Sequence, residues 1–403
     1  MSELIACKRC LYTTNHSLGL VIDDDGICSG CRIHEEKDTL DWDYKYDRLK
    51  QIVKDYKRHD SRQYDCIVPI TGAQDSYYIL HVVKNKLGLN PLLVTYNKYW
   101  NTPLGIKNLA NLRIKFNCDI IIQNINPLSV KKITKETLRK MGSIYWHCIA
   151  GQTVFPVQTA IRYKIPLIIW GAHQGMEQVG MFSHDHEVEM TRRYRKDHDL
   201  MGVEADDLIN CFNNLSESDI WQYRYPDDQS LNACGVRGVY LNNFIRWDPK
   251  AQHEKMMSTY GYKTAKFSRT FDCYDYVDCY NYMDLHDKIK LLKCGYSKVT
   301  DHATREIRHG RLTRDKAQYL VGYYENQAIQ YETLFNEWLG VNARGLEFVL
   351  EQYRLNEPDH FAHDSIGKSS VLGAEICKIN FKPNSHLSES LDDKYITIGK
   401  GFG

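Results

Sequence analysis

The most telling shortage in this 403-residue chain is of net charge, because 52 Lys and Arg face 51 Asp and Glu. Proteins that bind nucleic acid draw much of their affinity from a basic excess, so this balance weighs against RNA or DNA as a substrate. No apolar run approaches the roughly 18 residues of a membrane span, and the first ten residues, MSELIACKRC, contain no signal-peptide core. We therefore expect a cytoplasmic protein of two or three domains, without a membrane span.

The thirteen cysteines do not form a disulfide framework, because nine of them are scattered singly through periodic segments. The other four form two Cys-x2-Cys pairs, Cys7 with Cys10 and Cys28 with Cys31, separated by 17 residues. Such pairs bring four thiolates around one ion, so the spacing predicts a closed, structural zinc ribbon over residues 1–35. A segment this short has too little core to fold without such a metal site.

The rest of the chain is predicted to be an α/β unit followed by helices. Residues 36–60 are charged with apolar residues at helical spacing, which indicates a linker helix. Short apolar runs then alternate with helical patterns, which indicates a parallel sheet with helices on both faces over residues 61–215. A mainly helical domain over 216–382 and a patternless tail over 383–403 are expected to follow. The expected strands are 66–70, 92–96, 120–125 and 166–170, and the expected helices are 76–86, 103–116, 129–141 and 153–163.

The first expected strand ends at the turn Thr71-Gly72-Ala73-Gln74-Asp75-Ser76, where parallel sheets bind their ligands. A glycine lets backbone N–H groups approach phosphate oxygens, and the helix that follows adds the positive end of its dipole. The hydroxyls of Thr71 and Ser76 add donors, and Asp75 either caps the helix or holds a magnesium ion. The turn lacks both Gly-x4-Gly-Lys-Ser/Thr and Gly-x-Gly-x2-Gly, so a plain strand-to-helix turn stays an alternative.

This turn resembles the Ser-Gly-Gly-x-Asp-Ser loop of the PP-loop ATP pyrophosphatases, which cleave ATP between the α and β phosphates. Together with the ribbon and the blocks NPLLVTYNKYWNTPLGIKNLANL, IPLIIWGAHQG and GYSKVTDHATREIRHGRLTRDKA, it is similar to the N-acetyl sugar amidotransferase family, the WbpG/PseA-like proteins of bacterial surface-sugar biosynthesis. The resemblance runs from about residue 7 to about residue 320. Ala73 departs from it by replacing the second glycine, and Gln74 by replacing a residue that is often basic.

The resemblance implies an ATP- and Mg²⁺-dependent reaction that turns a sugar acetamido group into an acetamidino group. The amide oxygen is adenylylated with loss of pyrophosphate, ammonia attacks the activated carbon, and AMP leaves. The family usually works with a HisH-like glutaminase and a HisF-like, cyclase-like subunit that channels ammonia, and this chain has no glutaminase signature. UDP-linked diacetamido uronic acids and nonulosonic acids of the pseudaminic or legionaminic type are both open as the sugar.

Further site residues are expected at the ends of the strands. Residues 71–76, with Tyr96, Asn97 and Gly171, are expected to bind ATP, and Asp75, Ser76 and Glu177 to act in catalysis. The expected sugar contacts are Trp146, in a glycine-flanked loop at 142–152, His173, Gln174, Arg192 and Arg193. For each of these the alternative is a core, capping or solvated side chain. His184 and His186 lie in a segment that an exposed loop explains better than a metal site.

Two rival functions remain open at this point. A tRNA-thiolating enzyme of the same ATP-activating class would need a catalytic cysteine pair and a basic face, and no Cys-x2-Cys follows the ribbon. A degenerate paralogue that acts as a non-catalytic scaffold would explain Ala73 and Gln74.

Overall fold

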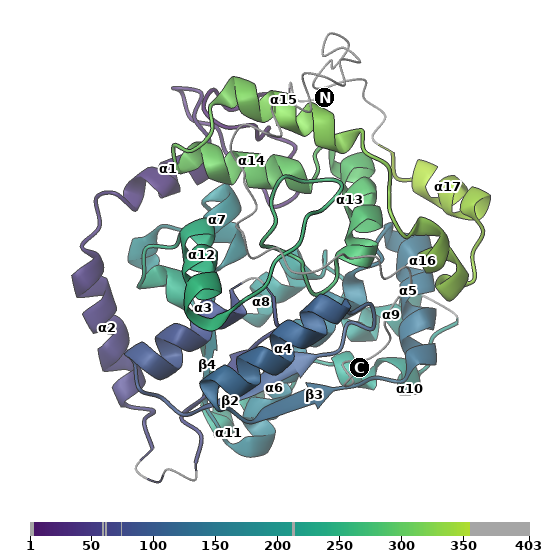
Figure 1. The fold of residues 1–403 in the computed structure, drawn as a ribbon. Coiled ribbons are helices and arrows are strands. Elements are labelled where there is room, and N and C mark those ends of the chain that lie inside the picture. Colours follow the sequence, from purple (N-terminus) through teal and green to yellow (C-terminus); the bar gives the residue numbers. More distant parts are fainter. Residues whose placement is uncertain (1–3, 59, 61–62, 74, 212–213, 355–403) are drawn as a thin grey trace.

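The computed structural model describes residues 4–58, 60, 63–73, 75–211 and 214–354, and a parallel five-stranded sheet lies at its centre (Figure 1). The strand order is β3-β2-β1-β4-β5, so the chain builds outward from β1 in one direction and then in the other. The four strands expected from the sequence are present to within two residues at each end. The five strands are β1 (Cys66–Pro69), β2 (Pro91–Tyr96), β3 (Ile120–Gln123), β4 (Leu167–Trp170) and β5 (Arg237–Tyr240).

Helices cover both faces of the sheet, which is why its central strands are apolar without interruption. Val68, Leu93 and Ile169 face α3 (Ser76–Leu80), α4 (Pro103–Phe116) and α12 (Pro249–Tyr260). Ile67, Leu92 and Ile168 face α6 (Trp146–Tyr163) and α11 (Asp228–Cys234) on the other side. A π-helix, η1 (His81–Lys86), continues α3, so the two together fill the single helix predicted over residues 76–86.

Local signals set the ends of these helices. The hydroxyl of Thr102 accepts a hydrogen bond from the Gly105 N–H at 2.9 Å, Pro103 occupies the first turn, and Asn117 ends α4 in the left-handed region. The next helix, α5 (Pro127–Met141), begins and ends in the same way, with Asn126 as its N-cap and a left-handed Gly142 as its C-cap.

The structure differs from the sequence analysis at the start of α6. Residues 146–152 were expected in a loop, but they are helical from Trp146 onward. Gly151 lies inside this helix. A Cβ at this position would come within 2.3 Å of the Tyr96 ring, so the glycine permits close packing and does not mark a turn.

The sheet also extends past residue 215, where the sequence analysis places the end of the α/β unit. Its fifth strand pairs with β4, from Leu167 opposite Arg237 to Trp170 opposite Tyr240. This strand has four residues and includes an arginine and a glycine, so no apolar run indicates it. Between β4 and β5 the chain forms, in addition to α11, the short helices α7 (Gln174–Val179), η2 (His184–His186), α8 (Arg192–Tyr194), η3 (Arg195–Asp199), α9 (Ala205–Cys211), α10 (Glu217–Ile220) and η4 (Trp221–Tyr223).

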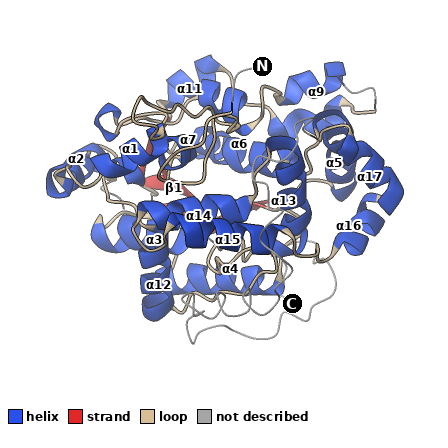
Figure 2. Cartoon of the chain, turned by 90° about the horizontal axis from the view of Figure 1, so that it is seen from above, coloured by secondary structure: helices blue, strands red, loops and turns tan. Residues whose placement is uncertain are grey.

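The N-terminal segment meets the C-terminal helical region over the carboxyl edge of the sheet, where the Tyr12 hydroxyl donates to Asp301 at 2.9 Å. The cysteine-containing segment leads into α1 (Ser29–Glu36), and α2 (Trp42–Lys54) fills the expected linker helix. In Figure 2, α7 and α14 lie on either side of β1. Among the described residues, no helix has both the length and the apolar character needed to cross a membrane. The C-terminal region is mainly helical, and after η5 (Leu241–Asn243) and α12 it contains α13 (Tyr280–Cys294), α14 (Lys298–Arg308), α15 (Arg314–Glu325), α16 (Glu332–Leu339) and α17 (Ala343–Glu351). The predicted tail, 383–403, lies outside the described residues.

Candidate functional site

A cavity of about 300 Å³ opens at the carboxyl ends of β1, β2 and β4. Its sheet-side wall includes Thr71, Tyr96 and Gly171, each of which follows or ends one of these strands. β1 and β4 are the neighbours between which the strand order reverses, and open parallel sheets place their ligands at that point. The topology and the cavity therefore indicate the same site.

The turn after β1 holds its own shape. Ser76 Oγ accepts a hydrogen bond from the Thr71 N–H at 3.1 Å and donates one to the Ala73 carbonyl at 2.8 Å. Gly72 has a φ of +83°, and a Cβ on it would lie 2.8 Å from Leu109 Cβ, so only glycine fits there. Thr71, Ala73, Asp75 and Ser76 all line the cavity.

Ala73 fits this turn without backbone strain. The positive φ that such a turn needs falls on Gly72, and Ala73 is not among the described residues with a positive φ. Its methyl group is fully buried and packs into the apolar cluster between β1 and α4. The missing second glycine therefore does not distort the turn. Gln74, the other departure, lies outside the described residues.

Asp75 faces a buried histidine that the sequence analysis did not single out. Asp75 makes no capping hydrogen bond to α3, and its Oδ1 lies 3.5 Å from Nε2 of His253 on α12. Burial disfavours the imidazolium, but Asp75, Asp275 and Asp272 outweigh it and raise the pKa of His253. An imidazole from the C-terminal region, with its charged form favoured, thus lies beside the carboxylate of the turn. No local pattern marks His253, because it is one polar residue on an otherwise ordinary helix.

The wall opposite the turn is one face of α14. The charged residues on this face recur every three or four positions, and each of them lines the cavity. They escaped the sequence analysis, although this spacing of charges in a helical segment is a signal that could have found them. They are Lys298, Asp301, His302, Arg305, Arg308 and, just past the helix, His309.

Arg305 organises this wall by pairing with the carboxylates around it. Its guanidinium contacts Asp272 and lies 3.2 Å from Asp275, and His302 Nε2 lies 3.4 Å from the same Asp275 oxygen. Burial opposes ionisation of Asp275, but His302 and Arg305 lower its pKa below the ordinary range. Asp272, Asp275 and His302 are close enough to share a metal ion, with all ligand atoms within 4.8 Å. The guanidinium already neutralises these carboxylates, so we interpret the group as an ion-pair network.

Glu177 on α7 lines the cavity, but both of its carboxylate oxygens are already bound. Lys37 lies 2.6 Å from Oε2, and the side-chain amide of Asn242 donates to Oε1 at 3.0 Å. Burial opposes ionisation, yet Lys37 and Asn242 outweigh it and lower the pKa of Glu177. A carboxylate paired in this way is a weak base, so in this arrangement Glu177 anchors α7 against α1.

The remaining predicted residues divide among the cavity, the core and the surface. Tyr96 and Gln174 line the cavity, and the Tyr96 hydroxyl lies 3.0 Å from His147 Nδ1 and 2.8 Å from the Tyr223 hydroxyl. The other predicted side chains do not line the cavity described here: Asn97 is buried, Trp146 packs in the core with its Nε1 donating to Val203, His173 caps α7, Arg192 pairs with Glu204, and Arg193 is 92% exposed. His184 pairs with Glu36 at 2.9 Å.

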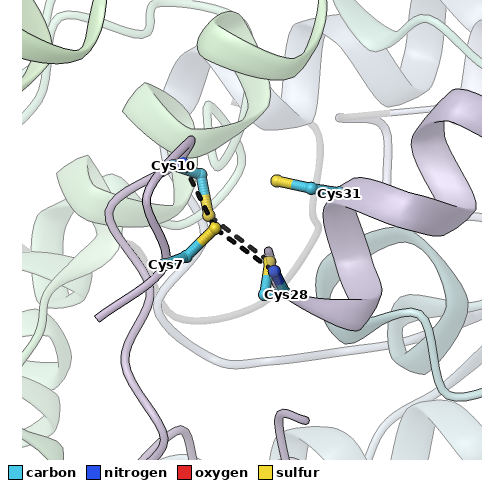
Figure 3. A group of neighbouring side chains, drawn as sticks. All are labelled: Cys7, Cys10, Cys28 and Cys31. Carbon is cyan, nitrogen blue, oxygen red and sulfur yellow. Dashed lines mark hydrogen bonds between the residues drawn. The ribbon is translucent and has the colours of Figure 1, made fainter. Parts of the chain in front are cut away.

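The four predicted metal ligands converge at one point (Figure 3). The ligand atoms of Cys7, Cys10, Cys28 and Cys31 lie within 4.8 Å of one another, and the Sγ atoms of Cys10 and Cys28 are 3.6 Å apart. Tetrahedral zinc with Zn–S bonds of about 2.3 Å requires sulfur atoms about 3.8 Å apart, so this group fits the ion. Backbone N–H groups of residues 9, 10 and 28 donate to Cys7 Sγ, as expected for a thiolate.

Comparison with known proteins gives one family match. Residues 254–371 match the model described as LPS biosynthesis protein WbpG-like, C-terminal domain. The uncharacterized protein MJ1599 of Methanocaldococcus jannaschii is 24% identical over 121 residues, which is 29% of this chain, and the match spans only 42% of that relative's length.

Two solved structures are similar in part. An NH3-dependent NAD synthetase from Campylobacter jejuni is 10% identical, with 48% of this chain and 92% of that one covered, at a TM-score of 0.28. An NMN synthetase from Francisella tularensis is 12% identical, with 56% and 98% covered, also at 0.28. These two similarities are too weak to assign a function, so the assignment of the C-terminal domain rests on the family match. The resemblance predicted from the sequence is confirmed there: this chain has a WbpG-like C-terminal domain, and that domain supplies the α14 wall of the cavity.

Proposed function

We propose that this protein is an ATP-dependent amidotransferase that converts the acetamido group of an N-acetylated sugar into an acetamidino group during the synthesis of a bacterial surface glycan. The observation that carries the proposal is the two-sided cavity. A turn resembling a PP-loop forms one wall, and the WbpG-like domain forms the other through α14. The two substrates would therefore meet between a nucleotide wall and a sugar wall.

The oxygen of an amide is a poor leaving group, so the reaction must first activate it. Adenylylation does this, and the enzyme must stabilise the charge that develops on the departing pyrophosphate. In the proposal the turn at 71–76 holds the phosphates through backbone and hydroxyl groups, which its internal hydrogen bonds keep in place beforehand. Asp75 would hold the Mg²⁺ that accompanies ATP, and this ion supplies charge neutralisation. His253 would keep Asp75 in position.

The α14 wall suits a sugar that carries both hydroxyl and anionic groups. Asp275 and Asp301 offer acceptors to hydroxyl or amide N–H groups, and Lys298 offers a donor to a carboxylate or phosphate. UDP-linked diacetamido uronic acids and nonulosonic acids both have this chemistry. Ammonia is mostly protonated at neutral pH, so we propose that a HisH-like glutaminase with a HisF-like channel subunit delivers it.

One structural feature weighs against each rival function. No cysteine is among the described residues that line the cavity, whereas a tRNA-thiolating enzyme needs a reactive thiol beside the activated base. The scaffold alternative relied on Ala73 and Gln74; Ala73 fits the turn without a positive φ, and Gln74 lies outside the described residues.

The test is a direct assay. The full chain is incubated with ATP, Mg²⁺, ammonium and a panel of N-acetylated surface sugars, while AMP release and exchange of oxygen for NH in the sugar are followed by mass spectrometry. We expect AMP and an amidine with one sugar, and loss of both in Asp75→Asn. Asp185→Asn, with a side chain that is 73% exposed, is the matched control and should behave as the wild type. Failure to bind ATP or release AMP with any sugar would contradict the proposal and favour the scaffold.

A further inference from the structure

Arg308, the last residue of α14, joins three parts of the molecule. Its Nη2 donates to Cys28 Sγ at 3.5 Å, and its Nη1 donates to the carbonyls of Glu177 at 2.9 Å and Gln178 at 2.8 Å. The guanidinium also stacks over the Tyr12 ring at 5.3 Å, and Arg308 lines the cavity. One side chain therefore contacts the four-cysteine site, helix α7 and the cavity.

Two glycines let the cysteine-containing segment, α7 and Arg308 approach one another closely. Gly30 lies between Cys28 and Cys31, and a Cβ there would fall 2.3 Å from Arg308 Nη2 and 2.4 Å from the Gln178 carbonyl. Gly180 ends α7 with a φ of +63°, and a Cβ on it would lie 2.3 Å from the Ser29 carbonyl. The knuckle that holds Cys28 and Cys31 is thus packed directly on the end of α7.

The helix that follows this knuckle also holds α7. Ser29 Oγ donates to the Val179 carbonyl at 2.5 Å, and the buried Lys37 at the end of α1 pairs with Glu177. His34 of α1 and Tyr12 of the cysteine-containing segment line the cavity themselves. The N-terminal segment is therefore part of the cavity wall as well as a small metal-binding unit.

A divalent ion with four thiolates has a net charge of −2, and a buried dianion needs a nearby cation. We propose that Arg308 is a positioning residue that couples the metal-loaded four-cysteine site to the cavity. It compensates the thiolate charge through Cys28, and with the same planar group it fixes the carbonyls of Glu177 and Gln178. Loss of the metal then loosens α7, which contributes Gln174, Glu177 and Gln178 to the wall. The inference rests on the proposed function only for what the cavity binds.

The first test measures zinc release from the zinc-loaded full chain to a chromophoric chelator. In Arg308→Gln we expect release about 10- to 100-fold faster than in the wild type, the usual range when a partner of a metal ligand is removed. Arg314→Gln is the matched control, because Arg314 donates to the Cys10 carbonyl at 3.3 Å and does not line the cavity. Its release rate should stay close to that of the wild type.

The second test measures amide hydrogen exchange of residues 174–181 in the same proteins. We expect protection there to fall in Arg308→Gln and in zinc-stripped wild type, but not in Arg314→Gln. Gly30→Ala keeps Arg308 and all four cysteines but displaces the guanidinium from Cys28 and α7, so it should lower the same protection and also speed zinc release. Arg308→Lys retains the charge and serves if the glutamine variant does not fold; it should release zinc at an intermediate rate.

Equal release rates in Arg308→Gln and Arg314→Gln would overturn the inference, and so would faster release without any change on α7. Neither readout uses ATP or a sugar. A protein that fails the amidotransferase assay but shows both effects would refute the proposed function and keep the coupling.

Discussion

The two walls of the cavity are built on different principles. The sheet-side wall is a backbone turn whose shape comes from one glycine and from hydroxyl groups that bond within the turn. The α14 wall consists of charged side chains that hold one another through ion pairs. A rigid backbone turn suits a ligand group common to many enzymes, such as phosphate, whereas a set of long side chains can be varied to suit one substrate. Specificity is therefore expected to reside on α14.

The largest effect is expected from removing the central cation of the α14 wall. Arg305→Gln leaves Asp272 and Asp275 buried without their partner, and breaking a buried pair from one side costs about 3–5 kcal/mol. Chemical denaturation should show this loss, together with greater stability at lower pH than at neutral pH because the freed carboxylates bind protons. Arg193→Gln, on an exposed arginine, should change stability by less than about 0.5 kcal/mol. A loss below about 1 kcal/mol for Arg305→Gln would mean that Arg305 does not stabilise the buried carboxylates of the network.

The next largest effect is expected on the sheet-side wall. Gly72→Ala must place a methyl group against Leu109 at a positive φ, and we expect a loss of about 2–4 kcal/mol from backbone strain plus overpacking. Gly261→Ala is the matched control, since it has a φ of +73° but nothing within 4 Å of the new methyl group. It should lose only the strain, about 1–2 kcal/mol. Equal losses in the two variants would show that the close approach to α4 is unimportant.

A smaller effect is expected for Trp146, which the sequence analysis placed among the sugar contacts. Trp146→Phe loses the hydrogen bond to the Val203 carbonyl and some core volume, so the free energy of unfolding should fall by about 1–3 kcal/mol. Because Trp146 does not line the cavity, the KM for the sugar should not change. A several-fold rise in KM at normal stability would restore Trp146 as a contact residue.

The smallest effect is expected from His253, whose imidazole lies beside Asp75 of the turn. The pKa of His253 is raised in the folded protein, so its contribution to stability is full below the unfolded pKa of about 6.5 and is lost as the pH rises through the folded value. The wild type should therefore exceed His253→Gln in stability by more at pH 6 than at pH 8. Denaturation at both pH values, repeated in Asp75→Asn, checks this. A difference that is independent of pH would mean that His253 is neutral.

Much of the sheet-side wall was predictable because its residues are neighbours in sequence. Alternating apolar runs and helical patterns located four strands, and the turn 71–76 follows the first of them. The fifth strand was missed because four residues that include Arg237 and Gly238 make no apolar pattern. The start of α6 was expected in a loop because Gly151 indicated one, whereas Gly151 makes room for the Tyr96 ring inside the helix.

The sequence by itself determined the four-cysteine group, the central strands and the glycine-containing turn after β1, because each depends on residue types at short, regular spacing. Only the tertiary structure decided what faces that turn. Thr71 and Arg305 are 234 positions apart, and the partners His253 with Asp75, Lys37 with Glu177 and Arg308 with Cys28 are joined by packing of separate elements. Local periodicity does not encode such pairings, because the sequence pattern of a polar residue on a helix face is the same whether its side chain contacts water, a carboxylate or a ligand.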